Sequence, residues 1–244
     1  MADFQAVTEH ISRLVLDWRL GPLRYPVNVW LVRGQEGYVL VDSGPVSTAD
    51  QVVAAVARTT SGQGVRLLLL THAHPDHGGG LAALRTAWNP PIVCHRLEVP
   101  FVTGELYYRE LPATNLAYWF GRYLIGANNW ELPVAKDLEG GQSVEGMAAI
   151  PLPGHTPGHL GFLHSLDHAM ICGDAVVSVG GQVGPPHALM TADPQTAAAS
   201  IKRVGQLDYR HLLPSHGEPI LERGRQAMLE FLGLGAEPQE VLWS

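Results

Sequence analysis

The chain has 244 residues, of which 46% are hydrophobic, and a formal net charge of −7. This composition can bury a sizeable core, and because Lys and Arg do not cluster we expect no nucleic-acid partner. The first twenty residues lack the long apolar run of a signal peptide, and no apolar run is long enough to span a membrane. With only two cysteines, Cys94 and Cys172, the sequence implies no disulfide framework. We therefore expect a cytoplasmic protein that does not associate with membranes.

Apolar and β-branched runs separated by turn residues predict strands in the first half of the chain. These strands lie over 4–17, 28–33, 38–41, 65–70 and 91–94, with helices over 48–60 and from 79 to 87. After residue 143 a similar pattern predicts strands over 147–152, 159–165, 168–173 and 209–213, and helices over 194–205 and 222–234. Such alternation is typical of sheets covered by helices. The predicted fold class is therefore α/β (α+β), in a single domain over residues 1–244.

The segment from about 98 to 135 interrupts this alternation and is predicted to be an inserted helical hairpin. It is rich in aromatic residues: Phe101, Tyr107, Tyr108, Tyr118, Trp119, Phe120, Tyr123 and Trp130. Two interpretations stay open. The insert either adds to the core or a dimer face, or it forms an apolar wall or lid over a binding site.

Side chains that commonly bind metals gather in four segments rich in glycine and proline. Residues 71–80 hold three histidines and an aspartate within six positions, and three further candidates lie in later loops. The full set is His72, His74, Asp76, His77, His155, Asp174 and His216. Each segment follows a predicted apolar strand, so the side chains can converge at one sheet edge. Imidazole and carboxylate groups suit Zn, Fe or Mn, and seven ligands are enough for two metals that share a carboxylate.

The segment around Pro75 is expected to be irregular, because proline and the glycines that follow His77 disfavour regular structure. The four side chains can then fan out, and the glycines let the backbone approach a metal closely. Histidines outside the four segments are interpreted as structural or surface residues: His10, His164, His168 and His211.

This set resembles the metallo-β-lactamase-fold superfamily, whose signature is His-x-His-x-Asp-His followed by distant His, Asp and His. The match runs from the Val41-Asp42-Ser43-Gly44 turn to Pro214-Ser215-His216-Gly217. The resemblance implies a four-layer αβ/βα sandwich with the aromatic-rich insert and a dinuclear site at the sheet edges. It assigns the ligands to two metals bridged by Asp174: His72, His74 and His155 to the first, and Asp76, His77 and His216 to the second.

Two metals held in this way make a bridging hydroxide available near neutral pH. Asp76 is the candidate catalytic residue that transfers a proton to the leaving group. Four residues are expected to orient the ligands from behind, with His159 anchoring its loop rather than binding metal: Asp42, Thr71, Thr156 and His159. Three residues are candidates for contact with substrate: Tyr25 in the segment Leu20 to Pro26, Trp119 in the insert, and His187 in the loop after Asp174.

Departures from known branches of the superfamily narrow the expected function. The segment from Gly154 to His159 resembles glyoxalase II, but the helical domain that grips glutathione there has no counterpart after His216. Many lactonases of this fold carry Tyr three positions after the bridging Asp, where this chain has Val177, so a lactonase would need another hydroxyl such as that of Tyr25. β-Lactamases of this fold usually lack the bridging carboxylate that Asp174 supplies.

The sequence therefore predicts a metal-dependent hydrolase of the glyoxalase II-like or lactonase-like branch. It is expected to bind two divalent metal ions, with zinc preferred over iron or manganese, and to cleave a small ester, thioester or lactone. Two alternatives stay open: a mononuclear iron oxygenase similar to persulfide dioxygenases, and a β-lactam hydrolase. The expected partners are a small-molecule substrate and, if the insert is a dimer face, a second copy of the chain.

Overall fold

The computed structural model describes residues 3–20, 23–123 and 130–234. A seven-stranded sheet is built from the first part of the chain. Its strands lie in space in sequence order: β1 (Gln5–Ala6), β2 (Ile11–Leu20), β3 (Leu23–Gly34), β4 (Gly37–Val41), β5 (Leu67–Leu69), β6 (Ile92–His95) and β7 (Lys136–Leu138). Strands β1 to β4 pair antiparallel, whereas β4 to β7 pair parallel. Parallel neighbours need crossover connections, and the helices α1 (Ala49–Thr59) and α3 (Leu81–Trp88) lie in two of them.

A five-stranded sheet is built from the second part of the chain. Its order is β14 (His211–Pro214), β11 (Ala169–Gly173), β10 (Leu160–His164), β9 (Met147–Pro151) and β8 (Ser143–Val144). Only β14 runs parallel to its neighbour β11, and helix α6 (Pro194–Gln206) precedes it. The helix α7 (Gly224–Phe231) and the hairpin of β12 (Val177–Val179) and β13 (Gln182–Gly184) also belong to this half of the chain. Two 3-10 helices complete the fold outside the insert: η1 (Val46–Thr48), which contacts β2 and α1, and η3 (Ala188–Met190), which contacts the insert.

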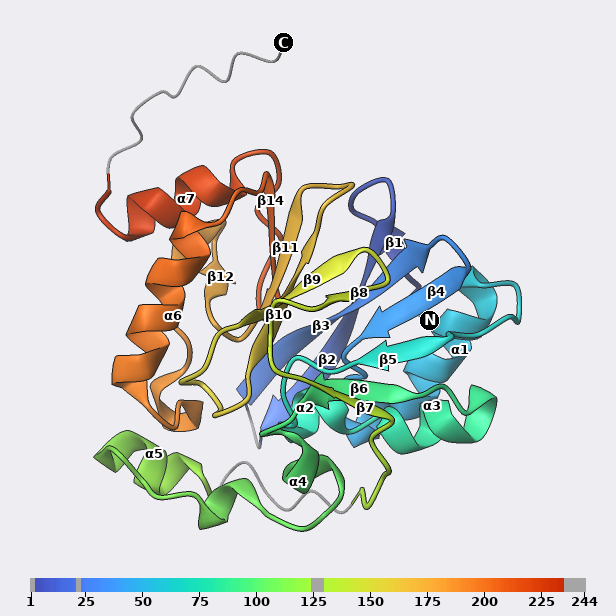
Figure 1. Cartoon of the computed structure of the whole chain (residues 1–244), viewed down its shortest axis with the longest axis horizontal. Helices are drawn as coiled ribbons and strands as arrows, with labels where there is room; N and C mark the ends of the chain where they lie inside the picture. Colours follow the sequence, from blue (N-terminus) through green and yellow to red (C-terminus); the bar gives the residue numbers. More distant parts are fainter. Residues whose placement is uncertain (1–2, 21–22, 124–129, 235–244) are drawn as a thin grey trace.

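Alternating side chains distribute the core over three hydrophobic clusters. In β11, Ala169 and Ile171 belong to the cluster between the two sheets, while Met170 and Cys172 belong to the cluster that includes residues of α6 and α7. A third cluster lies between the seven-stranded sheet and the helices α1 and α3. Figure 1 shows these two helices beside one sheet and α6 and α7 beside the other. The layers are helix, sheet, sheet and helix, which confirms the predicted αβ/βα sandwich.

The insert differs from the helical hairpin that the sequence predicted. The described part holds three short segments: the helix α4 (Val99–Val102), the 3-10 helix η2 (Tyr108–Glu110) and the helix α5 (Leu116–Gly121). Gly104, with a φ of +80°, ends the first, and Pro112 lies between the other two, so no long helix can form. Residues 124–129 of the predicted insert lie outside the described residues.

Aromatic residues of the insert fall into an inner and an outer set. Phe101, Tyr108 and Tyr118 are buried in the cluster beneath α1 and α3, and the rings of Phe101 and Tyr108 stack at 4.1 Å. Trp119, by contrast, is 44% exposed, and its ring contacts Phe120 and Tyr123 of the same segment. The inner set is therefore core, and the outer set forms an exposed aromatic surface.

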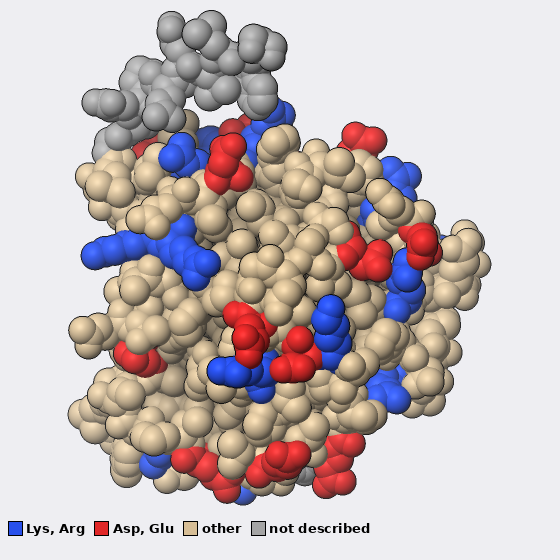
Figure 2. All heavy atoms as spheres, in the orientation of Figure 1, with Lys and Arg blue, Asp and Glu red and all other residues tan. Residues whose placement is uncertain are grey.

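Surface charge in Figure 2 is mixed, with Lys and Arg side chains interspersed among Asp and Glu side chains on the face shown. Ion pairs such as Arg96 with Glu139, at 2.7 Å, and Arg66 with Glu36, at 2.6 Å, join the two signs. No helix in the described part of the chain is long and apolar enough to cross a membrane.

Candidate metal centre

The seven predicted metal ligands lie together where the ends of the two large sheets meet. His72 to His77 follow β5, and His155, Asp174 and His216 follow β9, β11 and β14. Each of the seven side chains is buried, with no more than 7% of any residue exposed. Their donor atoms form overlapping groups whose members lie within 4.8 Å of one another. The four segments therefore converge, although they do so between two sheets rather than at one edge.

The first group consists of His72, His74 and His155 and is called the three-histidine group below. His155 Nε2 lies 3.1 Å from His74 Nδ1. Two imidazole nitrogens at this separation are placed as they would be around one ion, because zinc–nitrogen bonds are about 2.0–2.1 Å long. His155 Nδ1 lies 3.3 Å from the Thr191 hydroxyl, which leaves Nε2 free to face the other ligands.

The second group consists of Asp76, His77 and His216 and is called the aspartate group below. Asp76 Oδ2 lies 3.5 Å from His77 Nε2 and 3.3 Å from His216 Nε2. Asp174 connects the two groups, because its Oδ2 lies 3.4 Å from His155 Nε2 and 3.3 Å from His216 Nε2. A carboxylate in this position can bridge two metals.

Hydrogen bonds at the rear of the rings aim the lone pairs inward. His72 Nδ1 lies 3.1 Å from Thr71 Oγ1, and His77 Nδ1 lies 2.9 Å from Asp42 Oδ2. His216 Nδ1 bonds the Pro26 carbonyl at 2.8 Å. The Nε2 atoms of these three histidines, with Asp174 Oδ1, are buried and find no hydrogen-bond partner among the described residues. Buried polar atoms without partners are costly, and divalent cations would satisfy all of them. The residues present therefore fit a metal centre.

Charges divide unequally between the two groups. Burial lowers the pKa of His72 and His74 well below its usual value and that of His155 to about 3, so these rings are neutral. Burial also opposes protonation of His216, but the carboxylates of Asp174 and Asp76 outweigh it and raise its pKa to about 10. Without metal, His216 of the aspartate group is therefore protonated at neutral pH, and its positive charge lies where a bound cation would supply it.

The segment expected to be irregular is helical instead. Residues Pro75–Gly78 form the one-turn helix α2, closed by bonds of 3.0 and 2.9 Å from the amides of His77 and Gly78 to the His74 carbonyl. The prediction was wrong because proline at the first position of a helix stabilises its start, and the glycines lie at the end of the turn, where Gly78 is its last residue and Gly79 its C-cap. Gly78 also contacts Trp130 of the insert, whose ring occupies the space a side chain would take.

Three of the four residues expected behind the ligands contact them or their backbone. Asp42 accepts hydrogen bonds from the Thr71 amide at 2.8 Å and hydroxyl, and from His77 Nδ1. His159 Nε2 accepts from the Asp174 amide at 2.9 Å and joins none of the donor groups in the described chain. Thr156 instead donates to the carboxylate of Glu98, at 2.8 Å.

Glu98 and Tyr108 belong to this site but were missed by the sequence analysis. Glu98 is fully buried and accepts four hydrogen bonds, one of them from the Tyr108 hydroxyl. The Tyr108 ring packs edge-on against His74, with ring centres 4.5 Å apart. Burial raises the pKa of Glu98, although each of these hydrogen bonds opposes the rise. A signal was present in the sequence, since Glu98 is a lone charge within the apolar run from Leu97 to Val102.

The three substrate-contact candidates lie in different surroundings. Tyr25 is half-buried, and its ring centre is 4.3 Å from that of His216 and 6.1 Å from that of His187. Burial, followed by the charges of Asp174 and Asp76, raises the pKa of its phenol far above the usual value. Trp119 contacts its own segment, as described above. Tyr25 also belongs to β3 rather than to the predicted connecting loop.

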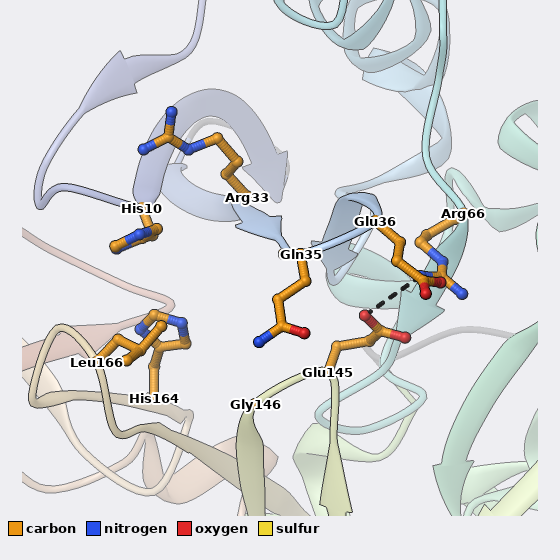
Figure 3. A pocket seen from close by; sticks show the side chains of 10 residues that line it. His10, Arg33, Gln35, Glu36, Arg66, Glu145, Gly146, His164 and Leu166 are labelled. Carbon is orange, nitrogen blue, oxygen red and sulfur yellow. Dashed lines mark hydrogen bonds and ion pairs between the residues drawn. The ribbon is translucent and has the colours of Figure 1, made fainter.

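Histidines set aside as structural lie away from this cluster. His10 and His164 line a separate cavity of about 460 Å³ beside Arg33 and Glu145 (Figure 3). The turn from β8 to β9 borders this cavity, so it is at the end of β9 opposite to His155. His10 Nδ1 bonds Asp167 Oδ1 at 2.6 Å, which ties the turn before β2 to the turn between β10 and β11.

Comparison with known proteins gives a consistent result. A family model described as the metallo-beta-lactamase superfamily matches residues 23–216. The chain is 31% identical over 204 residues to YflN, a probable metallo-hydrolase of Bacillus subtilis, and the match covers 75% of this chain and 76% of YflN. It is 29% identical over 182 residues to the hydroxyacylglutathione hydrolase of Yersinia pestis, covering 73% of this chain but 57% of that enzyme. The crystal structure of TTHA1623 in a di-iron-bound form superposes with a TM-score of 0.63 at 32% identity, over 86% of this chain and 96% of that one.

Proposed function

Because the chain belongs to the metallo-beta-lactamase superfamily and is a metal-dependent hydrolase, we propose that it cleaves a small ester, thioester or lactone with two bound divalent metal ions. The observation that carries the proposal is the position of Asp174. Its carboxylate reaches both the three-histidine group and the aspartate group within 3.4 Å. A bridging carboxylate of this kind fits two metals about 3.5–4 Å apart better than one.

Metals bound there would supply a hydroxide nucleophile near neutral pH and polarise the scissile carbonyl. The chain's own residues do the rest. Asp76 is proposed to carry a proton to the leaving group, because it is the carboxylate of the cluster that contacts only one group. The Tyr25 phenol, which stays protonated at neutral pH, is proposed to donate a hydrogen bond to the developing oxyanion.

Separate observations support the proposed substrate class and the proposed metal. The similarity to a hydroxyacylglutathione hydrolase favours an acyl thioester or ester, and the exposed ring of Trp119 suits an apolar acyl group. Zinc is our first proposal for the metal. The di-iron-bound relative and the mixed imidazole and carboxylate ligands make iron or manganese the alternatives.

A hydrolysis screen tests this proposal. Metal-loaded protein is assayed with aryl esters, acyl thioesters and lactones of increasing chain length, beside Asp174→Asn and the surface variant Glu139→Gln. We expect hydrolysis of at least one class by the unmodified protein and Glu139→Gln. Asp174→Asn should lose this activity, because it lacks the carboxylate that would join the two metals supplying the hydroxide. Oxygen uptake with a persulfide, in the absence of any hydrolysis, would replace the proposal with the iron oxygenase alternative.

A further inference from the structure

Glu98 occupies a position that the hydrolase chemistry above does not explain. It precedes α4, is 0% exposed and belongs to none of the metal-binding donor groups in the described chain. A buried carboxylate is stable only when its oxygens are fully hydrogen-bonded. The partners of its two oxygens therefore indicate which part of the site Glu98 stabilises.

The two oxygens of Glu98 bind two different ligand-bearing loops. Oε2 accepts from the Ala73 amide at 2.9 Å and from the Tyr108 hydroxyl. Oε1 accepts from the Thr156 hydroxyl at 2.8 Å and from the Gly158 amide at 2.8 Å. Ala73 lies between His72 and His74, and Thr156 follows His155 directly. One carboxylate thus holds both loops that supply the three-histidine group.

Close packing around the carboxylate indicates that this contact is built into the fold. A Cβ atom added to Gly158 would lie 2.8 Å from Glu98 Cγ and 2.9 Å from Oε1. Glycine is therefore required for the loop to approach so closely. Tyr108 contributes on the other side, because it bonds Glu98 and packs its ring against His74.

In the described part of the chain, no hydrogen bond joins the aspartate group to Glu98. His77 is held by Asp42, and His216 is held by the Pro26 carbonyl. Asp42 also accepts from Thr71, whose hydroxyl contacts His72, so Asp42 serves both groups. Among the described residues, the hydrogen bonds of the Glu98 carboxylate reach only Tyr108 and the two loops of the three-histidine group.

We propose that Glu98 is a positioning residue for the metal held by the three-histidine group, acting through the Ala73 and Gly158 amides and the Thr156 hydroxyl. Loss of one carboxylate oxygen should loosen one loop and leave the aspartate group intact. In Glu98→Gln the shape is kept, but an amide NH₂ replaces one oxygen and faces a backbone N–H that can only donate. Residues behind metal ligands typically change metal affinity by about 10–100-fold when altered, and we expect a loss of that size at one of the two positions.

The test measures zinc affinity position by position and rests on the two-metal proposal only for its design. His216→Ala leaves the three-histidine group as the intact position, and His155→Ala leaves the aspartate group. Zinc content is measured by elemental mass spectrometry after dialysis against buffers of fixed free zinc concentration. Adding Glu98→Gln to His216→Ala should weaken the remaining ion about 10–100-fold, whereas adding it to His155→Ala should change affinity less than about twofold. Glu139→Gln is the matched control. It is the same Glu-to-Gln change at an exposed residue directly after β7, and it should alter zinc affinity in neither background.

Equal weakening in both backgrounds, or none in either, overturns the proposal. Circular dichroism and urea unfolding of the metal-free proteins verify that each variant folds. If Glu98→Gln does not fold, Thr156→Val removes a single donor from Oε1 and should show the same selectivity with a smaller loss; an unselective loss overturns the proposal. If the unmodified protein binds only one zinc ion, the two-metal proposal fails, while the role of Glu98 is still decided by whether Glu98→Gln weakens that ion.

Discussion

Replacing Gly173 with alanine should destabilise the fold and displace the bridging Asp174. Gly173 has a φ of +55°, a left-handed conformation that costs a non-glycine residue about 1–2 kcal/mol. An added Cβ would lie 2.5 Å from His159 Nε2 and 3.1 Å from Thr71 Cβ. His159 must then move and lose its bond to the Asp174 amide, which leaves a buried donor unsatisfied at a cost of about 1–3 kcal/mol. The expected total is about 2–5 kcal/mol.

Gly181 offers a matched control in the turn between β12 and β13. Its φ is +78°, and an added Cβ would meet nothing within 4 Å. Gly181→Ala should therefore cost only the backbone contribution of about 1–2 kcal/mol. Urea unfolding of the metal-free proteins measures both changes. If the two variants are equally stable within about 0.5 kcal/mol, a difference too small for a lost buried hydrogen bond, the contact between Gly173 and His159 does not constrain Asp174 and the reasoning is refuted.

Three further predictions address the site. Removing both metals with a chelator should lower Tm by roughly 10–20 °C. Each ion at 100 times its Kd stabilises the fold by about 2.7 kcal/mol, and each kcal/mol shifts Tm by roughly 2–4 °C for a chain of this size. Scanning calorimetry measures the shift, and an unchanged Tm would contradict tight binding. The metal-free protein should lose stability as pH rises from 6.5 to about 10, because His216 binds a proton in the folded state that the unfolded state has already released; urea titrations at pH 6.5 and 9.5 measure this, and a gain at the higher pH would contradict it. Tyr25→Phe should lower kcat about 10²–10³-fold with unchanged zinc content, whereas Tyr38→Phe should have no effect in steady-state assays. A change in KM alone would contradict the proposed hydrogen bond from Tyr25 to the oxyanion.

Much of the fold was predictable because strands such as β5, β6 and β11 are buried on both faces and therefore appear as continuous apolar runs bounded by turn residues. The run Val65 to Leu70 predicted β5, and Ala/Val-rich patterning predicted α1 to within a residue or two. The ligand cluster was predictable because each ligand-bearing segment follows an apolar strand and contains glycine or proline. Convergence of those strand ends then brings residues more than a hundred positions apart, such as His72 and Asp174, into one group.

The position of Glu98 depends on contacts that no local pattern encodes. Glu98 reaches loops 25 and 58–60 positions away along the chain, and only their meeting in space gives it three of its four donors. The insert was predicted as a helical hairpin although Gly104 and Pro112 separate its short helices. The burial of Phe101, Tyr108 and Tyr118 in the core then fixes where these helices lie. The helix α2 was missed because proline was taken as a breaker when it stands at the first position, where it stabilises a helix.

Metal content of the freshly purified protein, measured by elemental mass spectrometry without added metal, tests the central claim most directly. The two donor groups joined by Asp174 predict two zinc, iron or manganese ions per chain, and one ion or none in Asp174→Asn. A single ion in the unmodified protein, with the same content in Asp174→Asn, would contradict a bridged two-metal hydrolase.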